Sequence, residues 1–346
     1  MASQADSEGA DIPAPPERAF RSRSPKRRRE SSRPSRSTSA ASSEAPGVFA
    51  VDKPAGMTSH DVVARVRRVL PGTKVGHAGT LDPDATGVLV ICVGKATKVS
   101  AFLMEGEKEY EGVGRLGITT DSQDASGAVV REREVNVDAA AVREAALGFV
   151  GRIEQIPPMY SAVKIAGQKL YRLARKGVEI ERPARPVVIH ELQIGEVRPP
   201  DFEFRLRSSK GTYVRTLVHD LGEALGCGAH LLRLVRTRQG GFGLEDAVPF
   251  DVLGTDAAAE ALGAARRTPA ESLEFLPVRK LTAITEPLRA GAQVPLDRLE
   301  DGPDGVIRLG LPGGGIAGIG TVGAEGARVL HLFPPGSPWG RGRRSS

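Results

Sequence analysis

The sequence has little cysteine and no long apolar stretch. It contains two cysteines among 346 residues, Cys92 and Cys227, which are too few for a disulfide framework and fit a reducing compartment. No apolar run is long enough to cross a membrane, and the N-terminal residues contain no hydrophobic signal segment. We therefore expect a cytoplasmic protein that does not insert into a membrane.

Net basic charge is confined to the two ends of the chain. The formal net charge is +6, to which residues 1–46 contribute nine Lys or Arg and six Asp or Glu, and the residues after Gly340 three Arg. Acidic and basic side chains are therefore equal in number over residues 47–340. Binding of a nucleic acid by the folded part would require its basic side chains to gather on one face.

The first 46 residues are rich in Ser, Arg, Pro and Ala and contain almost no large apolar side chains. Such a composition cannot bury enough surface to fold alone, so we expect residues 1–46 to form a disordered basic extension. Weak attraction to RNA phosphates is one interpretation of its charge. A disordered arm without a function is the other.

Apolar periodicity predicts strands and helices in mixed order over residues 47–275. Strands are expected at 47–51, 88–93, 108–117, 187–197, 202–207 and 231–236. Helices are expected at 58–70, 95–102, 138–149, 168–176 and 216–225, followed by an Ala-rich helical stretch at 251–274. Because the two types do not alternate strictly, we expect an α+β domain around a large mixed sheet.

Residues 276–335 differ in composition and are rich in Gly, Val, Leu and Pro. Their short apolar runs, at 305–309, 315–319 and 329–333, are typical of strands. We expect a second, small β domain here, followed by a basic tail at 336–346.

The most informative segment is the turn that precedes the apolar strand at 88–93, because it carries a single carboxylate, Asp82. Its Gly and Pro residues allow another molecule to approach the backbone closely. No His/Cys cluster accompanies Asp82, so a metal site is not indicated, and no Ser–His pair forms a nucleophile elbow. A carboxylate that acts on a substrate is one interpretation, and an ordinary Asp-Pro turn is the other.

Blocks of sequence in order along residues 48–245 resemble the TruB family of pseudouridine synthases. The segment 76–83 is similar to the family's G-H-x-G-x-L-D-P motif, and further similar blocks lie at 51–59, 108–127, 156–164, 210–217 and 227–234. The resemblance implies a pseudouridine synthase fold, with a mainly antiparallel sheet flanked by helices. It also implies an RNA-binding domain of PUA type at 276–335.

The activity that the resemblance implies is isomerisation of uridine to pseudouridine in the T-loop of tRNA, at position 55. This reaction breaks the N1–C1′ bond, turns the uracil and joins C5 to C1′. It needs a carboxylate and a pocket for the detached base, but no cofactor and no metal. The implied partner is the T-stem-loop of tRNA, bound by a monomer without an obligatory protein partner. The alternatives are a non-catalytic RNA-binding protein that folds tRNA and an RNA-guided, dyskerin-like synthase.

The resemblance also assigns roles within the matching blocks. Asp82 is implied as the catalytic residue, and Arg215 as the cation that pairs with it and keeps it charged. The ring of Tyr110 is implied as the platform on which the flipped base stacks, with its hydroxyl near the C5 proton. The further substrate-binding residues, which line the pocket, enter the RNA or support the loop, are Tyr213, Leu234, His77, Lys53 and Asp124. Ordinary core packing stays open for Leu234.

Overall fold

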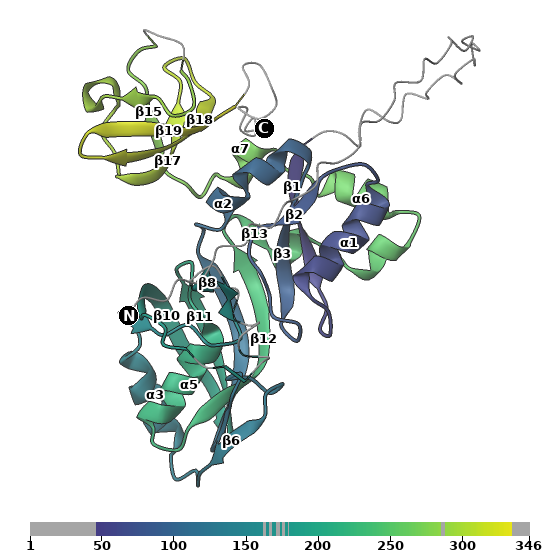
Figure 1. The fold of residues 1–346 in the computed structure, drawn as a ribbon, viewed down its shortest axis with the longest axis vertical. Coiled ribbons are helices and arrows are strands. Elements are labelled where there is room, and N and C mark those ends of the chain that lie inside the picture. The colour runs from purple at the N-terminus through teal and green to yellow at the C-terminus, as the bar shows by residue number, and fades with distance from the viewer. Residues whose placement is uncertain are drawn as a thin grey trace, which may run out of the picture. The chain divides into compact units, whose positions relative to one another are not determined.

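The computed structural model describes residues 46–161, 164–165, 168–170, 174, 177–178, 180–284 and 288–333 (Figure 1). Within these residues one ten-stranded sheet has the order β14-β1-β3-β12-β4-β11-β10-β7, with β2 beside β3 and β13 beside β12. Its strands are β1 (Gly47–Lys53), β2 (Val75–His77), β3 (Thr86–Val93), β4 (Lys108–Leu116), β7 (Gly151–Gln155), β10 (Arg185–Arg198), β11 (Asp201–Ser208), β12 (Ala229–Gln239), β13 (Phe242–Gly243) and β14 (Ala247–Pro249). Only β1–β14 and β3–β12 pair in parallel, which confirms the mainly antiparallel sheet.

Helices and two small hairpins surround this sheet. The helices are α1 (Ser59–Val69), η2 (Gly94–Val99), α2 (Ser100–Leu103), α3 (Ala139–Leu147), α5 (Val214–Ala224), η3 (Leu244–Asp246), η4 (Asp251–Gly254), α6 (Ala258–Ala264) and α7 (Pro269–Ser272). The hairpins are β5 (Ile118–Thr120) with β6 (Val129–Glu132), and β8 (Lys164–Ile165) with β9 (Gln168–Lys169). None of the helices in the described part of the chain is long and apolar enough to span a membrane.

The strands β1 and β3 are buried on both faces. Phe49 and Val51 contribute to a core shared with α1, α3 and α5, whereas Val48 and Ala50 contribute to a core shared with η2, α2 and α7. Burial on both faces explains why the sequence at 88–93 is continuously apolar instead of alternating.

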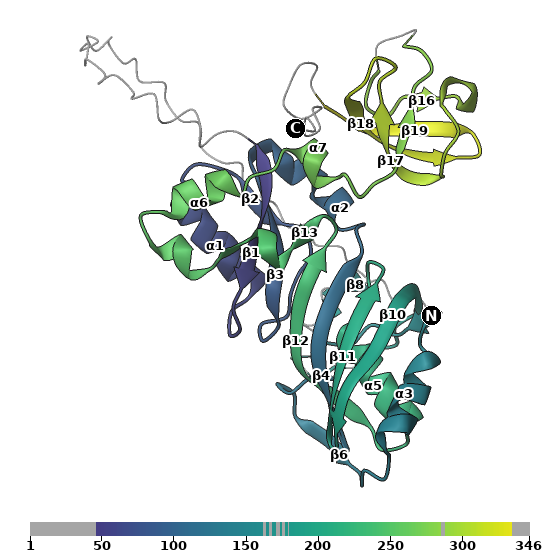
Figure 2. The same ribbon diagram turned by 180° about the vertical axis from the view of Figure 1, so that it is seen from behind.

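The other half of the sheet is covered on one face only. In Figure 2, β4, β10, β11 and β12 present a face that none of the described helices covers. Cross-strand ion pairs follow this face, including Glu111–Arg205 at 3.1 Å and Glu107–Arg207 at 2.9 Å. Buried and exposed residues alternate along β4 and β11. Such alternation is expected for an antiparallel sheet with one face in solvent.

Several predicted elements have different bounds in the structure. The helix predicted at 216–225 is α5, which begins at Val214, and the strand predicted at 231–236 is β12, which runs from Ala229 to Gln239. The helix predicted at 95–102 is a 3-10 helix followed by one turn of α-helix. The helical stretch at 251–274 is three short helices, since Gly254 ends η4 and Pro269 begins α7.

The prediction of a helix at 168–176 is wrong at its start. Residues 168–169 form β9 and pair with β8, so a local hairpin replaces the helix there. Most of the remaining positions lie outside the described residues.

The C-terminal region forms a separate sheet in the order β15-β17-β18-β19-β16. Its strands are β15 (Val278–Lys280), β16 (Gln293–Val294), β17 (Gly305–Gly310), β18 (Ile316–Gly323) and β19 (Gly326–Leu332), with the 3-10 helix η5 (Leu296–Arg298) between β16 and β17. The apolar runs predicted as strands fall in β17, β18 and β19. Ile307, Leu309 and Val329 form its core.

Candidate active site

The segment between β2 and β3, here named the Asp82 loop (residues 78–85), is held by groups outside it. The hydroxyl of Ser59, the first residue of α1, accepts a hydrogen bond from the Leu81 N–H at 2.9 Å and donates to the Leu81 carbonyl at 3.1 Å. The Gly56 N–H donates to the Pro83 carbonyl at 3.1 Å. Because the backbone is fixed on both sides of Asp82, its carboxylate has a defined direction.

Lys53, at the end of β1, joins the segment 51–59 to the Asp82 loop. Its side chain is fully buried, and its Nζ donates to the carbonyls of Pro54, Met57 and Pro83 at 2.7 to 2.8 Å. Three donated bonds require the three hydrogens of an ammonium group. Burial lowers the pKa of Lys53 to about 8 against the opposing effect of nearby carboxylates, so the ammonium form predominates below about pH 8. Lys53 thus holds the backbone of the Asp82 loop through the Pro83 carbonyl.

Substitution of Lys53 tests this support. Lys53→Met should lower the free energy of unfolding by about 3 kcal/mol, because three carbonyl groups lose their donor. Urea unfolding at pH 7, followed by circular dichroism, measures the effect. Lys95→Met is the matched control on the exposed surface of η2 and should change the free energy of unfolding by less than about 0.5 kcal/mol. Equal unfolding midpoints for the two variants would contradict the role given to Lys53.

Arg215, in the first turn of α5, bridges two carboxylates. Its Nε and Nη2 lie 3.0 and 3.3 Å from the two oxygens of Asp82, and its Nη1 lies 3.3 Å from Asp124 Oδ2. The same guanidinium donates to the carbonyls of Ser122 and Tyr160, each at 2.9 Å. The side chain of Arg215 is 6% exposed, whereas that of Asp82 is 43% exposed. The pairing expected from the sequence is present, and it holds an accessible carboxylate over a buried cation.

The charge of Asp82 is only partly compensated. Although 43% of the Asp82 side chain is exposed, the protein around it limits the solvation of its carboxylate and raises its pKa above the usual value. The positive charge of Arg215 opposes this rise, and Asp124 adds to it. A pKa raised by folding means that ionised Asp82 lowers the stability of the folded protein at neutral pH. An accessible carboxylate whose pKa is raised by its surroundings and lowered by a buried cation is typical of a functional site.

Two glutamine side chains fix the start of α5. Gln155, at the end of β7, accepts from the Tyr213 N–H at 3.0 Å and donates to the Tyr213 carbonyl at 3.3 Å. Thr216 donates to Gln123 at 2.8 Å, and Gln123 has a φ of 63°, which is uncommon for a residue with a side chain. This bond joins α5 to the loop that carries Asp124. The sequence analysis did not predict either glutamine, since an isolated Gln gives no pattern in a single sequence.

Tyr110 and Leu234 lie on the core face of neighbouring strands β4 and β12. Tyr110 is 8% exposed and Leu234 is 7% exposed, and both belong to the core cluster that includes Leu81. Burial raises the pKa of Tyr110, so its phenol is protonated at neutral pH. Core packing accounts for the position of Leu234, while contacts of Tyr110, Tyr213 and Leu234 with a base stay predictions.

His77, at the end of β2, lies beside the Asp82 loop. Its ring packs edge-on against His60, with ring centroids 5.2 Å apart. Burial lowers the pKa of His77, and the neighbouring His60 adds to this effect, so the ring is neutral at pH 7. A neutral, half-buried ring suits stacking between bases, which is the role that the resemblance implies.

A metal centre has no support within the part of the chain that the structure describes. No three His, Cys, Asp or Glu side chains there come close enough together to hold an ion. Asp124 is instead occupied by hydrogen bonds from Arg215, Ser122 and Ser126.

Two residues of β12 were missed by the sequence analysis. Arg236 is 2% exposed and donates to the carbonyls of Gly79 and Thr80, and Gln239 donates to the carbonyl of Ala78. Strand β12 therefore holds the backbone on the N-terminal side of Asp82. Arg236 could have been noticed in the sequence, because it is a charged residue on the apolar face of the strand predicted at 231–236.

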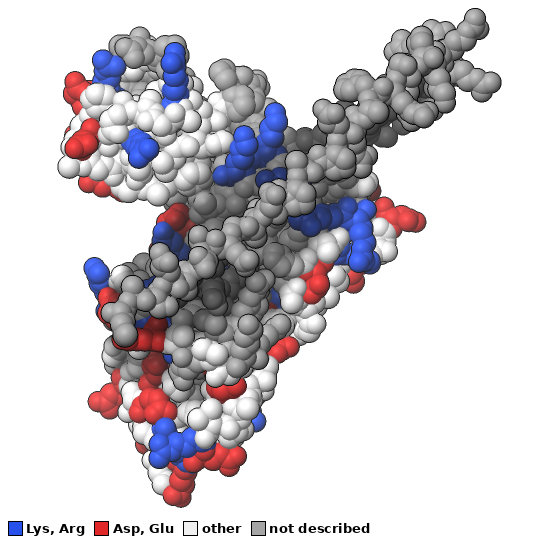
Figure 3. Space-filling model, viewed as in Figure 1, with Lys and Arg blue, Asp and Glu red and all other residues white. Residues whose placement is uncertain are grey.

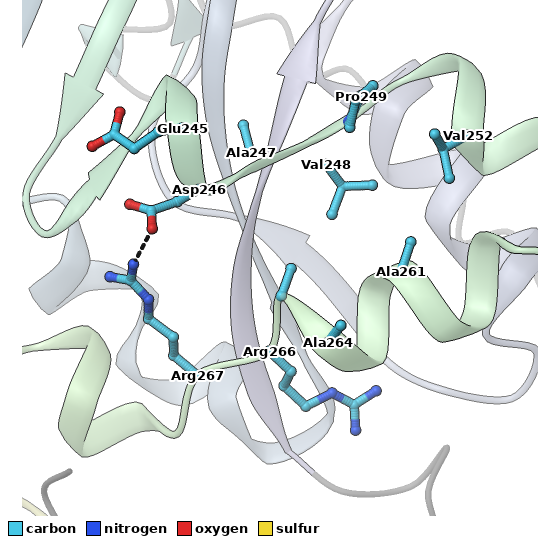
Figure 4. A pocket seen from close by; sticks show the side chains of 11 residues that line it. Glu245, Asp246, Ala247, Val248, Pro249, Val252, Ala261, Ala264, Arg266 and Arg267 are labelled. Atoms are coloured by element: carbon cyan, nitrogen blue, oxygen red, sulfur yellow. Dashed lines mark hydrogen bonds and ion pairs between the residues drawn. The ribbon is translucent and has the colours of Figure 1, made fainter. Parts of the chain in front are cut away.

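A hollow of about 400 Å³ lies beside β14 and α6 (Figure 4). Its floor is formed by small apolar side chains, and its acidic groups are already paired, Asp246 with Arg267 and Glu245 with Arg238. None of its lining residues belongs to the Asp82 loop, so we assign it no part in the site.

Comparison with known proteins identifies the family. Residues 67–214 match the model of the TruB family pseudouridylate synthase N-terminal domain, and residues 215–273 match that of the tRNA pseudouridylate synthase B C-terminal domain. The tRNA pseudouridine synthase B of Opitutus terrae is 51% identical over 211 residues, which are 61% of this chain and 88% of the relative. The chain belongs to the TruB family.

Further similarities within and beyond the TruB family agree with this membership. The tRNA pseudouridine synthase B of Burkholderia mallei is 47% identical over 260 residues, covering 75% of this chain and 85% of the relative. The solved Cbf5-Nop10-Gar1 complex contains a chain with a TM-score of 0.63 and 27% identity, covering 84% of this chain and 85% of that one. The pseudouridine synthase fold predicted from the sequence is thereby confirmed.

Proposed function

We propose that this chain isomerises uridine 55 in the T-loop of tRNA to pseudouridine, with Asp82 as the catalytic residue. The observation that carries the proposal is the accessible Asp82 carboxylate, fixed on the buried guanidinium of Arg215 and not fully neutralised by it. Relatives named tRNA pseudouridine synthase B, at 47 to 51% identity, support the class of reaction and of substrate.

The reaction requires the glycosidic bond N1–C1′ to break while the base stays bound, and C5 then to bond to C1′ with loss of its proton. An ionised carboxylate is needed near the ribose or the base whether it attacks C1′, adds to the ring or removes a sugar proton. Arg215 keeps Asp82 ionised, and Ser59, Lys53 and Arg236 hold the backbone around it. Positioning of this kind supplies much of the rate in an enzyme without a cofactor.

The target base of a folded T-loop must leave its stack before it can reach Asp82. We propose that the extruded uracil stacks on Tyr110, with Tyr213 and Leu234 completing the pocket, and that the neutral ring of His77 fills the gap in the RNA. Stacking on an aromatic ring contributes about 1–3 kcal/mol per base. Asp124 acts through Arg215, and Lys53 acts through the Asp82 loop.

Phosphates of the T-stem would meet exposed basic side chains of α1 and η2, here named the basic band. Arg67 and Arg68 are exposed on α1, and Lys95 and Lys98 are exposed on η2. Arg67 donates to the Val75 carbonyl of β2, which brings α1 against the strand that leads into the loop. In Figure 3 basic side chains gather over α1 and beside α2. Gathering of charge on one face overcomes the lack of net charge in residues 47–340.

The remaining parts of the proposal follow from the same reaction. No cofactor is needed, the chain acts as a monomer, and tRNA as substrate together with two buried free cysteines suits the cytoplasm. We propose that the C-terminal sheet is a PUA-like RNA-binding domain at 276–335. The catalytic domain then extends over 47–275, between the basic extension at 1–46 and this C-terminal domain, which the tail at 336–346 follows.

Incubation of the purified protein with an unmodified T-arm hairpin, without any guide RNA, tests the proposed function. Pseudouridine should form at position 55 and at no other uridine of the hairpin, as read by mass spectrometry after chemical labelling. A hairpin with cytidine at position 55 is the control substrate. Binding without product would favour a non-catalytic RNA-binding protein, and product only with an added guide RNA would favour the dyskerin-like alternative.

A further inference from the structure

Arg236 lies where three parts of the site meet. In the sheet register it is opposite Tyr110 of β4 on one side and Gly87 of β3 on the other. Gly87 has a φ of 97°, and a Cβ built there would lie 2.3 Å from the Arg236 carbonyl. Only a glycine therefore lets β3 approach β12 closely enough to bring the Asp82 loop over the Arg236 side chain.

The guanidinium of Arg236 contacts the backbone on both sides of Asp82. Its Nε donates to the Val88 carbonyl at 2.7 Å, beyond the loop, and its Nη1 and Nη2 donate to the carbonyls of Thr80 and Gly79 at 3.3 and 3.2 Å, before Asp82. The donors of an arginine are spread over three nitrogens and point in different directions, so they reach the Val88 carbonyl and the Gly79 and Thr80 carbonyls at once, whereas a lysine has all its donors on one nitrogen.

The same guanidinium belongs to the residue opposite Tyr110 in the sheet register, and it acts on the titration of the Tyr110 phenol. Arginine has only donors, so in a hydrogen bond between the two side chains the phenol oxygen accepts. Burial raises the pKa of Tyr110, and the charge of Arg236 opposes this rise. One buried side chain thus holds the Asp82 loop and places its positive charge next to the tyrosine phenol.

We propose that Arg236 is a positioning residue of the isomerisation, which fixes Asp82 and Tyr110 relative to each other without touching the substrate. This inference rests on the proposed function, and it adds a residue that the motif comparison did not single out. Loss of the guanidinium lowers the rate of the chemical step while the basic band and the stacking rings remain, so RNA binding is retained.

Arg236→Gln and Arg236→Lys test the proposal. The single-turnover rate on the T-arm hairpin should fall about 100-fold in the glutamine variant, as for the loss of one preorganised donor. The lysine variant, which keeps the charge but not the fork, should also be slow. The dissociation constant of the hairpin should be close to that of the unsubstituted chain. Amide hydrogen exchange in residues 78–85 should become faster.

A second readout does not depend on turnover. With 13Cζ-labelled tyrosine, the Tyr110 resonance is assigned by its loss in Tyr110→Phe, and it should shift in Arg236→Gln because the phenol loses the neighbouring positive charge. Tyr110→Phe also closes a double-mutant cycle, in which the effect of Arg236→Gln on the rate should be smaller in the Tyr110→Phe background. Arg267→Gln removes a half-buried arginine of the hollow beside β14, whose Nη1 donates to the Gly241 carbonyl. As control, it should lower the melting temperature and leave the single-turnover rate unchanged.

The outcomes separate the two proposals. Folded Arg236 variants with an unchanged rate, an unchanged Tyr110 resonance and an unchanged exchange in residues 78–85 would overturn the role of Arg236. If the unsubstituted chain makes no pseudouridine, the proposed function fails, while the resonance and the exchange still decide whether Arg236 positions the loop. If Arg236→Gln does not fold, Arg236→Lys supplies the same measurements.

Discussion

Asp82→Asn should nearly abolish formation of pseudouridine, lowering the single-turnover rate by about 10⁴-fold, while the T-arm hairpin still binds. The asparagine keeps the size of the side chain and removes only its charge and basicity. The folded state should not lose stability, because the raised pKa of Asp82 shows that its charge is unfavourable there. A melting temperature at or above that of the unsubstituted chain would separate lost chemistry from lost folding.

Asp84→Asn is the control for this substitution. Asp84 lies two positions further along the same loop and is exposed, and its substitution makes the same change of charge. Its single-turnover rate should be close to that of the unsubstituted chain. Retained turnover in Asp82→Asn would refute the catalytic assignment. A low-pH decline of the rate centred above the usual carboxyl range should also be seen in the unsubstituted chain, since ionised Asp82 is the active form and its pKa is raised.

Arg215→Met should lower the single-turnover rate by about 10³-fold and the free energy of unfolding by about 3 kcal/mol. The substitution leaves Asp82 and Asp124 without a cation and the carbonyls of Ser122 and Tyr160 without a donor. Because the charge of Arg215 opposes the rise in the pKa of Asp82, its removal should move the low-pH decline of the rate further toward neutral pH. Rates between pH 5 and 9, with urea unfolding, measure both effects.

Arg115→Met provides the matched control for Arg215→Met. Arg115 also forms a two-bond pair with a carboxylate, Asp201, at 2.7 and 2.8 Å, but the pair is more than a third exposed and belongs to β4 and β11. Its loss should cost less than about 1 kcal/mol and leave the pH profile unchanged. Equal pH profiles for Arg215→Met and the unsubstituted chain would contradict the electrostatic role of Arg215.

The sequence predicts the elements of this fold better than their pairing. The run at 88–93 and the alternation in 202–207 give β3 and β11 from hydrophobicity alone, since burial on two faces and on one face leave different patterns. The short β14 was not predicted, because three residues are too few for a period to emerge. The place of β12 between β3 and β4 was also beyond reach, because no local property of residues 229–239 specifies which strands flank them.

The sequence likewise predicts only some residues of the candidate site. Asp82 and Arg215 could be named because their motifs are specific, and their contact bears out the pairing expected between them. Ser59, Gln155 and Arg236 could not, because each acts by bonding a backbone group that is distant in sequence. Every residue has a backbone carbonyl. A side chain that bonds one therefore has no partner residue of a particular type that the sequence could reveal.

The position of β12 also bears on how the protein is made. During synthesis, β3 and β4 leave the ribosome well before residues 229–239, at about 5–20 residues per second a delay of roughly 10 s. Until then each of the two strands has an unpaired edge, of the kind that promotes association between chains. A ribosome that stops before residue 229 would therefore release a polypeptide that has Asp82 but no finished sheet, and that is prone to aggregate.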